Sequence, residues 1–194
     1  FWIFITILIL VILDRTFSLL NFGFIYTDID QLILWNAAID YSQGIFHEPY
    51  FYGQPYNYML ESIVAVPFIW LNVPVYIALP LSTSLITLFP FVVLALILYK
   101  RKHFFWSFLC LAFPVLLPLE FSFLTSISRG NVQALLFLPL LFIPLLNPQK
   151  KHSVLFLMIG SGLCFIANTS SVVFILPVFI YVYSFHYKSI KFYL

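Results

Sequence analysis

Long apolar runs dominate this chain and restrict it to folds that lipid can surround. The longest, residues 74–99, contains no charged side chain. Because a helix rises 1.5 Å per residue, about 20 apolar residues cross the hydrocarbon core of a bilayer. Further runs cover residues 104–123, 132–146 and 153–185, and with 8% charged against 63% hydrophobic residues the polar surface cannot enclose a soluble globule. We therefore expect an all-α polytopic transmembrane helical bundle.

Two apolar segments leave questions open. Residues 153–185 are interrupted at residues 168–171, so they form either two helices that meet at a polar turn or one long broken helix. The chain opens at Phe1, within an apolar run that ends at Leu13 without a basic leader or a small-residue cleavage site. We expect residues 1–194 to be a single transmembrane domain, a fragment of a longer chain.

Charge is distributed unevenly between the connections. Seven basic residues lie in alternate connections and at the end of the chain: Lys100, Arg101, Lys102, Lys150, Lys151, Lys188 and Lys191. By the positive-inside rule these segments are cytoplasmic. All the acids then fall on the outer side: Asp14, Asp28, Asp30, Asp40, Glu48, Glu61 and Glu120. Only Arg15 and Arg129 are basic there, and we expect Arg15 to extend toward the membrane interface.

Several function classes are not supported by the sequence. It has no basic patch for nucleic acid, so nucleic acid is not an expected partner. Cys110 and Cys164 lie in apolar runs without metal-ligand spacing, and we predict that they are small packing residues. We assign no metal site.

The sizeable polar stretch is an outer loop, residues 14–58, and it contains a helix signal. Thr27 is a candidate N-cap, Asp30 follows three residues later as in a capping box, and Gly44 supplies a stop. Five residues share one face of this helix: Ile29, Leu32, Ile33, Asn36 and Ile39. We expect an amphipathic helix along the outer membrane surface.

The sequence allows two interpretations of Asp28 and Asp30. An acid in the first turn stabilises a helix by roughly 0.3–1 kcal/mol without any chemical role. Alternatively, the two carboxylates form a site for a hydroxyl-bearing substrate or for a cation, and a carboxylate within hydrogen-bond reach can take a proton from an attacking hydroxyl. The sequence leaves both readings open.

Aromatic side chains crowd the second half of the loop. They are Tyr50, Phe51, Tyr52, Tyr56 and Tyr58, and they surround two prolines and a glycine. Their flat apolar faces with polar edges suit sugar rings or lipid headgroups. An interfacial aromatic belt has the same composition.

The order of these motifs resembles a known family. An apolar helix, an outer loop with TDIDQ, the segment YFYGQPYNYMLESIVAVPF and then alternating spans are similar to the amino-terminal part of GT-C superfamily membrane glycosyltransferases, particularly the bacterial family 39-like enzymes related to protein O-mannosyltransferases. The family's tyrosine-rich GQPY-type segment with a Leu-Glu pair matches Gly53, Gln54, Pro55, Tyr56, Leu60 and Glu61. The segment around Asn168 and Thr169 lacks the lysine often found there in the family.

The resemblance implies an inverting transfer of a hexosyl or pentosyl group from a polyprenyl-phosphate donor to an acceptor hydroxyl of a glycan, lipid or protein. In the family an outer-loop acidic motif supplies the catalytic base, a role that would fall on Asp30, with Asp28 beside it. The protein would be a multi-pass protein of the bacterial inner (plasma) membrane, with its active site on the periplasmic or extracellular face. No cofactor is assigned, and a divalent cation remains an open alternative.

Further residues are candidates for substrate binding. The leaving phosphate needs a positive partner, and Arg129 at an outer helix start is our candidate, with a loop arginine that balances Glu120 as the alternative. His47 is a second phosphate contact or a solvated loop residue. Tyr52, Gln54, Tyr56 and Glu61 complete the candidate set, and Glu61 is also placed to brace Arg15 or the loop.

Two other functions remain open. A transporter or permease subunit would suit the many membrane prolines, although the apolar runs offer almost no ionisable residue to line a pathway. A non-catalytic assembly or lipid-scaffolding protein would reduce the acids to markers of topology, and Asp30 would then be replaceable.

Overall fold

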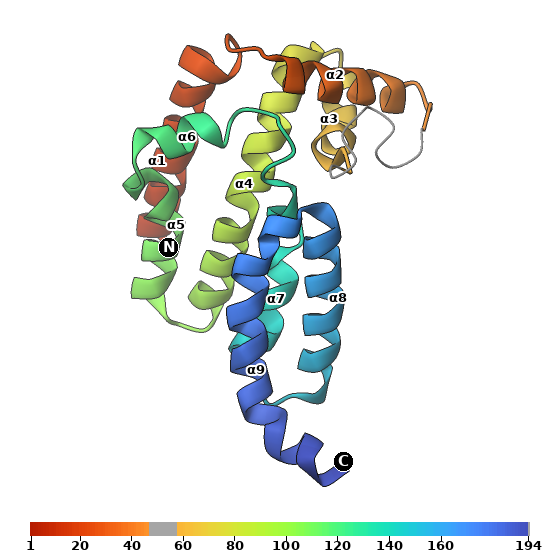
Figure 1. Cartoon of the computed structure of the whole chain (residues 1–194). Coiled ribbons are helices and arrows are strands. Elements are labelled where there is room, and N and C mark those ends of the chain that lie inside the picture. The colour runs from red at the N-terminus through yellow and green to blue at the C-terminus, as the bar shows by residue number, and fades with distance from the viewer. Residues whose placement is uncertain (47–57, 194) are drawn as a thin grey trace.

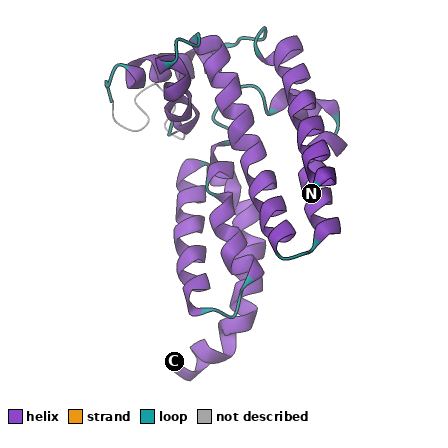
Figure 2. Cartoon of the chain, turned by 180° about the vertical axis from the view of Figure 1, so that it is seen from behind, coloured by secondary structure: helices purple, strands orange, loops and turns teal. Residues whose placement is uncertain are grey.

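The computed structural model describes residues 1–46 and 58–193 and is all-helical over them, without a strand (Figure 1, Figure 2). The α-helices are α1 (Trp2–Ser18), α2 (Ile29–Ser42), α3 (Leu60–Trp70), α4 (Val75–Lys100), α5 (Phe104–Leu116), α6 (Leu119–Leu124), α7 (Leu138–Leu146), α8 (Lys151–Ala167) and α9 (Val172–Tyr193). Three short elements join them: the π-helical turn η1 (Leu19–Gly23) and the 3-10 turns η2 (Gln133–Leu136) and η3 (Thr169–Ser171). The predicted all-α class is confirmed for these residues.

Three described helices are long and apolar enough to cross a membrane. They are Trp2–Gly23, Val75–Lys100 and Thr169–His186. The 26 residues of α4 correspond to a rise of about 39 Å, which exceeds the hydrocarbon thickness of a typical bilayer. Membrane-spanning character is therefore supported by length and composition, while the full polytopic arrangement stays a prediction.

Two of the predicted apolar runs are divided where local chemistry requires it. The run 104–123 breaks because Leu117 precedes Pro118 and is extended, with a ψ of 157°. The run 153–185 forms two antiparallel helices, α8 and α9, that meet at Asn168 (Figure 1). The side chain of Asn168 accepts a hydrogen bond from the Ser170 amide at 2.9 Å and so caps η3. Of the two alternatives for this run, the polar turn is confirmed.

The first helix extends further than expected. α1 runs through Asp14 to Ser18 and continues as a π-helical turn to Gly23, so helical structure extends past residue 14, where the outer loop was predicted to start. The polar pair Asp14 and Arg15 stays on the helix because α6 supplies partners for it. Because Gly23 has no side chain, η1 and Ser126 can lie close together: a Cβ at Gly23 would lie 3.3 Å from the Cβ of Ser126.

α2 lies across one end of the long helices and packs on α3 and α4 (Figure 1). The buried contact is formed by Leu34, Ala37, Ala38 and Tyr41 of α2 together with Met59, Ala65, Val66, Ala78 and Leu79. Of the apolar face named from the sequence, Ile29, Leu32 and Ile39 are exposed, whereas Ile33 packs partly against this core. α2 thus has one face for the protein and a second apolar face directed outward.

Two further cores connect the remaining helices. One joins α1, α4 and α5 through Phe4, Ala95 and Leu111. The other joins η2, α7, α8 and α9 through Ala134, Leu141, Leu157, Cys164, Ala167 and Val182. Both cysteines are free, and Cys164 packs in this core as the sequence predicts.

Charge is separated along the long helices. The α4–α5 and α7–α8 connections and the end of α9 lie at the end of the molecule opposite α2 (Figure 1). Arg101 links the α4–α5 connection to the α7–α8 connection, because its Nη1 donates to the Leu146 carbonyl at 3.2 Å and its Nη2 to Asn147 Oδ1 at 3.1 Å. The basic connections therefore share one end, and the start of α2, with Asp28 and Asp30, lies at the other.

The packing of α2 predicts unequal effects for two of its leucines. Leu34 is 0% exposed, whereas Leu32 is 47% exposed. Leu34→Ala leaves a cavity between three helices, and we expect it to lower the free energy of unfolding by about 2–5 kcal/mol. Leu32→Ala is the matched control and should have a much smaller effect in detergent micelles, measured as the midpoint of thermal unfolding. Equal losses for the two variants would contradict this orientation of α2.

Candidate functional site

An ion pair joins two segments at the acidic end of the molecule. Arg129 Nε donates to Asp28 Oδ2 at 2.7 Å, and Nη2 of the same guanidinium contacts the same oxygen. The pair is partly buried, with 33% of the Arg129 side chain and 19% of the Asp28 side chain exposed. Asp28, and not Glu120, is therefore the carboxylate partner of Arg129. The hydrogen bond that Arg129 donates to Asp28 also raises the pKa of Arg129, which keeps the guanidinium charged.

Asp28 has a second task at the start of α2. Its Oδ1 accepts a hydrogen bond from the Gln31 amide at 2.9 Å, and its own backbone is extended, so it is the N-cap. The sequence placed the cap at Thr27, one residue too early. Gly44 has a φ of +78° just beyond the helix, so the predicted stop is confirmed.

Aromatic side chains support the arginine from one side. The Tyr26 ring centroid lies 6.0 Å from Arg129 Cζ, and Arg129 Nη2 donates to the Tyr26 hydroxyl at 3.2 Å. Phe22 stacks on Tyr26 with centroids 5.1 Å apart and contacts Phe123 at 4.8 Å. The end of α1 and α6 thus fix the position of the guanidinium.

Asp30 lies in the first turn of α2 and is exposed. Its charge adds to that of Asp28 in raising the pKa of Arg129, so the three groups form one electrostatic cluster. Of the two acids, Asp30 is the one whose carboxylate faces the surroundings.

Glu61 is fully buried below this cluster. Its Oε2 lies 2.6 Å from the Thr83 hydroxyl of α4, which in turn lies 2.6 Å from the Ser128 hydroxyl. Burial raises the pKa of Glu61 to about 7, although the Thr83 hydroxyl and the Gly130 backbone act in the opposite direction. The Gly130 backbone approaches the carboxyl without a hydrogen bond to Oε1. Glu61 therefore links α3 to α4 and, through Thr83, to the turn of Arg129, a partner that the sequence did not suggest, and its side chain does not reach the surface.

Arg15 is buried, contrary to the expected extension toward the interface. Only 4% of the residue is exposed, and Nη1 donates to the Ser122 carbonyl at 3.0 Å and to the Thr125 hydroxyl at 2.9 Å. The Ser122 hydroxyl donates to Asp14 Oδ2 at 3.1 Å, so α6 binds both charged residues of α1. These hydroxyl partners were missed from the sequence, since isolated Ser and Thr residues give no signal for a contact more than 100 positions away.

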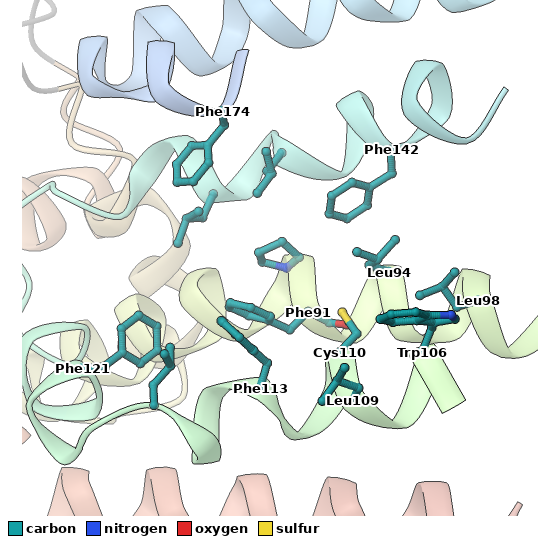
Figure 3. Close-up of a pocket in the computed structure, with 14 residues that line it drawn as sticks. Phe91, Leu94, Leu98, Trp106, Leu109, Cys110, Phe113, Phe121, Phe142 and Phe174 are labelled. Atoms are coloured by element: carbon teal, nitrogen blue, oxygen red, sulfur yellow. The ribbon is translucent and has the colours of Figure 1, made fainter. Parts of the chain in front are cut away.

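An apolar groove opens between two groups of helices (Figure 3). It has a volume of about 580 Å³ and is lined from α4, α5 and α6 on one side and from η2, α7 and α9 on the other. Figure 3 shows Phe142 and Phe174 facing Phe91 and Phe113 across it. Phe121 of α6 lines the groove, and the next residue, Ser122, binds Arg15 through its backbone carbonyl.

Four candidate residues fall outside the described segments: His47, Tyr52, Gln54 and Tyr56. Within the described ones, no three His, Cys, Asp or Glu side chains form a group that could hold a metal ion. A cation between Asp28 and Asp30 would have to compete with bonds already made, because Oδ1 of Asp28 caps α2 and Oδ2 binds Arg129.

Compared with family models, curated proteins and solved structures, the chain gives no match. What the site does is therefore inferred from its geometry and its chemistry.

The double role of Asp28 predicts a graded series of variants. Asp28→Ala removes the cap and the ion pair, and the cap alone is worth about 0.5–2 kcal/mol. Asp28→Asn keeps a side-chain oxygen for the Gln31 amide and loses only the charge. The free energy of unfolding in micelles should fall most for Asp28→Ala and less for Asp28→Asn, with Asp30→Asn as the control that changes least. Equal stability of the two Asp28 variants would contradict the capping role.

The buried carboxyl of Glu61 predicts a pH-dependent stability. Its pKa rises from 4.5 to about 7 on folding, so the folded state binds the proton more tightly than the unfolded state. The stability of the wild type relative to Glu61→Gln should therefore fall as the pH rises from 4.5 to about 7 and level off above that range. Unfolding midpoints measured across this range test the expectation, with the exposed Glu120→Gln as control. A flat difference between wild type and Glu61→Gln would overturn it.

Proposed function

We propose that the protein is a membrane glycosyltransferase that moves a sugar from a polyprenyl-phosphate-linked donor to an acceptor hydroxyl at the outer membrane face. The observation that carries the proposal is the Asp28–Arg129 pair at the start of α2, with exposed Asp30 beside it. Such a site holds an acceptor of protons and a fixed positive charge side by side. Both are needed when a hydroxyl attacks an anomeric carbon and a phosphate leaves.

The two aspartates take different roles in this proposal. Asp28 is committed to Arg129 and to the Gln31 amide, so it orients the guanidinium. Asp30 is exposed and is the general base that receives the acceptor proton. As the proton passes to Asp30, the acceptor oxygen forms its bond to the anomeric carbon, the bond from that carbon to the phosphate oxygen breaks, and the configuration inverts.

Arg129 stabilises the leaving lipid phosphate. Its guanidinium is held by Asp28 and Tyr26 on one side while a third of the side chain remains exposed. A planar guanidinium can bind a phosphate through parallel N–H groups, and one that is already positioned loses little freedom when it does so. The negative charge that develops on the leaving oxygen would then meet a fixed positive charge.

The apolar groove supports the choice of a lipid-linked donor. Its volume of about 580 Å³ and its lining of aromatic and aliphatic side chains suit an isoprenoid chain (Figure 3). The groove lies between helices of which α4 and α9 are long enough to span a bilayer. A donor anchored there would remain in the membrane while its phosphate extends toward the acidic end.

Transfer of label from a radiolabelled polyprenyl-phosphate sugar tests the proposal in membranes that contain the full-length protein. Asp30→Asn removes the base, and we expect the rate to fall about 100-fold or more. Arg129→Gln should lower it as well, because the leaving phosphate loses its positive partner. Glu120→Gln changes an exposed acid on α6 and serves as the control with an unaltered rate. Undiminished transfer by Asp30→Asn would reject the base assignment, and no transfer by the wild type would reject the function.

A further inference from the structure

Glu61 lies where three segments meet beneath the Arg129 turn. It belongs to the first turn of α3, its partner Thr83 to α4, and the next hydroxyl in the chain, Ser128, directly precedes Arg129. Gln133 ties the same junction together, because its Oε1 accepts a hydrogen bond from the Leu60 amide at 3.2 Å. The buried carboxyl is thus linked through two hydroxyls to the residue that precedes the surface arginine.

The Thr83 hydroxyl has three hydrogen-bond contacts but only one hydrogen atom. Its hydroxyl has contacts with Glu61 Oε2 at 2.6 Å, with Ser128 Oγ at 2.6 Å and with the Leu79 carbonyl at 3.1 Å. A hydroxyl donates one hydrogen bond and accepts two, and the carbonyl can only accept. If each hydrogen makes one hydrogen bond, all three contacts are satisfied when Thr83 donates to Leu79 while Glu61 and Ser128 both donate to Thr83. A Thr83 hydroxyl that donates to an ionised Glu61, which lowers the pKa of the carboxyl, leaves the Leu79 contact unmade. This arrangement requires a protonated Glu61.

The second carboxyl oxygen leads to the same conclusion. Oε1 is buried without a hydrogen-bond partner in the described part of the chain. An ionised carboxylate in that position would carry an unpaired charge in a buried junction, which costs far more than an unpaired carbonyl of a neutral acid. The Gly130 backbone approaches the group without compensating for this burial.

The charged and titratable groups of the elements packed around Glu61 do not change this balance. On the elements packed around Glu61 they are Asp28, Asp30, Asp40 and Tyr41 at or on α2, Tyr58 before α3, Tyr76, Tyr99 and Lys100 on α4, and Arg129 in the turn. Among the described residues, burial, Thr83 and Gly130 account for the altered acidity of Glu61, with no contribution from a charge. The proton is therefore held by the fold and not by a neighbouring ion.

We propose that Glu61 stores a proton as a neutral carboxylic acid and that its loss rearranges the turn of residues 128–130 that carries Arg129. When the proton leaves, the Thr83 hydroxyl must turn toward the carboxylate and gives up its bond to Leu79. The new charge attracts donors such as the Gly130 amide, which moves the turn relative to Asp28. Glu61 is a positioning residue, and the proposal is independent of whether the protein transfers sugars.

Infrared difference spectroscopy of the full-length protein in lipid nanodiscs tests the stored proton. The wild type should show the carbonyl band of a buried carboxylic acid that disappears as the pH is raised through about 7. Glu61→Gln should lack the band, Glu120→Gln should retain it, and Thr83→Val should shift it by removing its hydrogen-bond acceptor. If the wild type has no such band below pH 7, or if Glu61→Gln retains it, the proposal is wrong.

A spin label next to the turn tests the coupling. With Cys110 and Cys164 replaced by serine, a label at exposed Asn131 should change mobility with the same pH midpoint as the infrared band. Adding Glu61→Gln should make that label insensitive to pH, and a label at Met158 on α8, 67% exposed, should be insensitive in both backgrounds. A band that titrates while the Asn131 label does not respond would show that the proton is stored without moving the turn, which contradicts the proposal.

Discussion

The ion pair between Asp28 and Arg129 is the contact on which the acidic end of this molecule depends. It joins residues 101 positions apart and fixes the start of α2 to the turn that follows α6. The same carboxylate caps α2, so the helix that lies across the long helices begins where the arginine is bound. Loss of this one side chain would release a helix terminus and a charged turn together.

Among the described residues, two residues of the charged types (Asp, Glu, Lys and Arg) are buried, Arg15 and Glu61, and both have partners from another helix. Arg15 obtains them from α6, and Glu61 from Thr83 and, through it, from Ser128. This is the behaviour expected where no water is present to solvate a charge. The turn of residues 128–130 is consequently held from two sides, by a surface aspartate above and by a buried carboxyl below.

The sequence predicted the helices better than it predicted the site. Apolar runs and single residues with local effects, such as Gly44 and Asn168, carry enough information to place helix ends, whereas the break before Pro118 within the run 104–123 was not predicted. The burial of Arg15 and the pairing of Asp28 with Arg129 depend on contacts between distant segments, for which one sequence has no signal. The helix N-cap was misplaced by one residue because Thr27 and Asp28 are both good caps, and only the backbone shows which one is used.

The central claim is that the end carrying Asp28 and Arg129 faces the outside of the membrane and the basic connections face the cytoplasm. Labelling of single cysteines in intact cells with a membrane-impermeant maleimide tests it, at exposed Ile25 before α2 and at exposed His103 before α5, in a background without Cys110 and Cys164. We predict that Ile25→Cys is labelled in intact cells and that His103→Cys is labelled only after permeabilisation. Labelling of His103→Cys from the outside, with Ile25→Cys protected, would contradict the account.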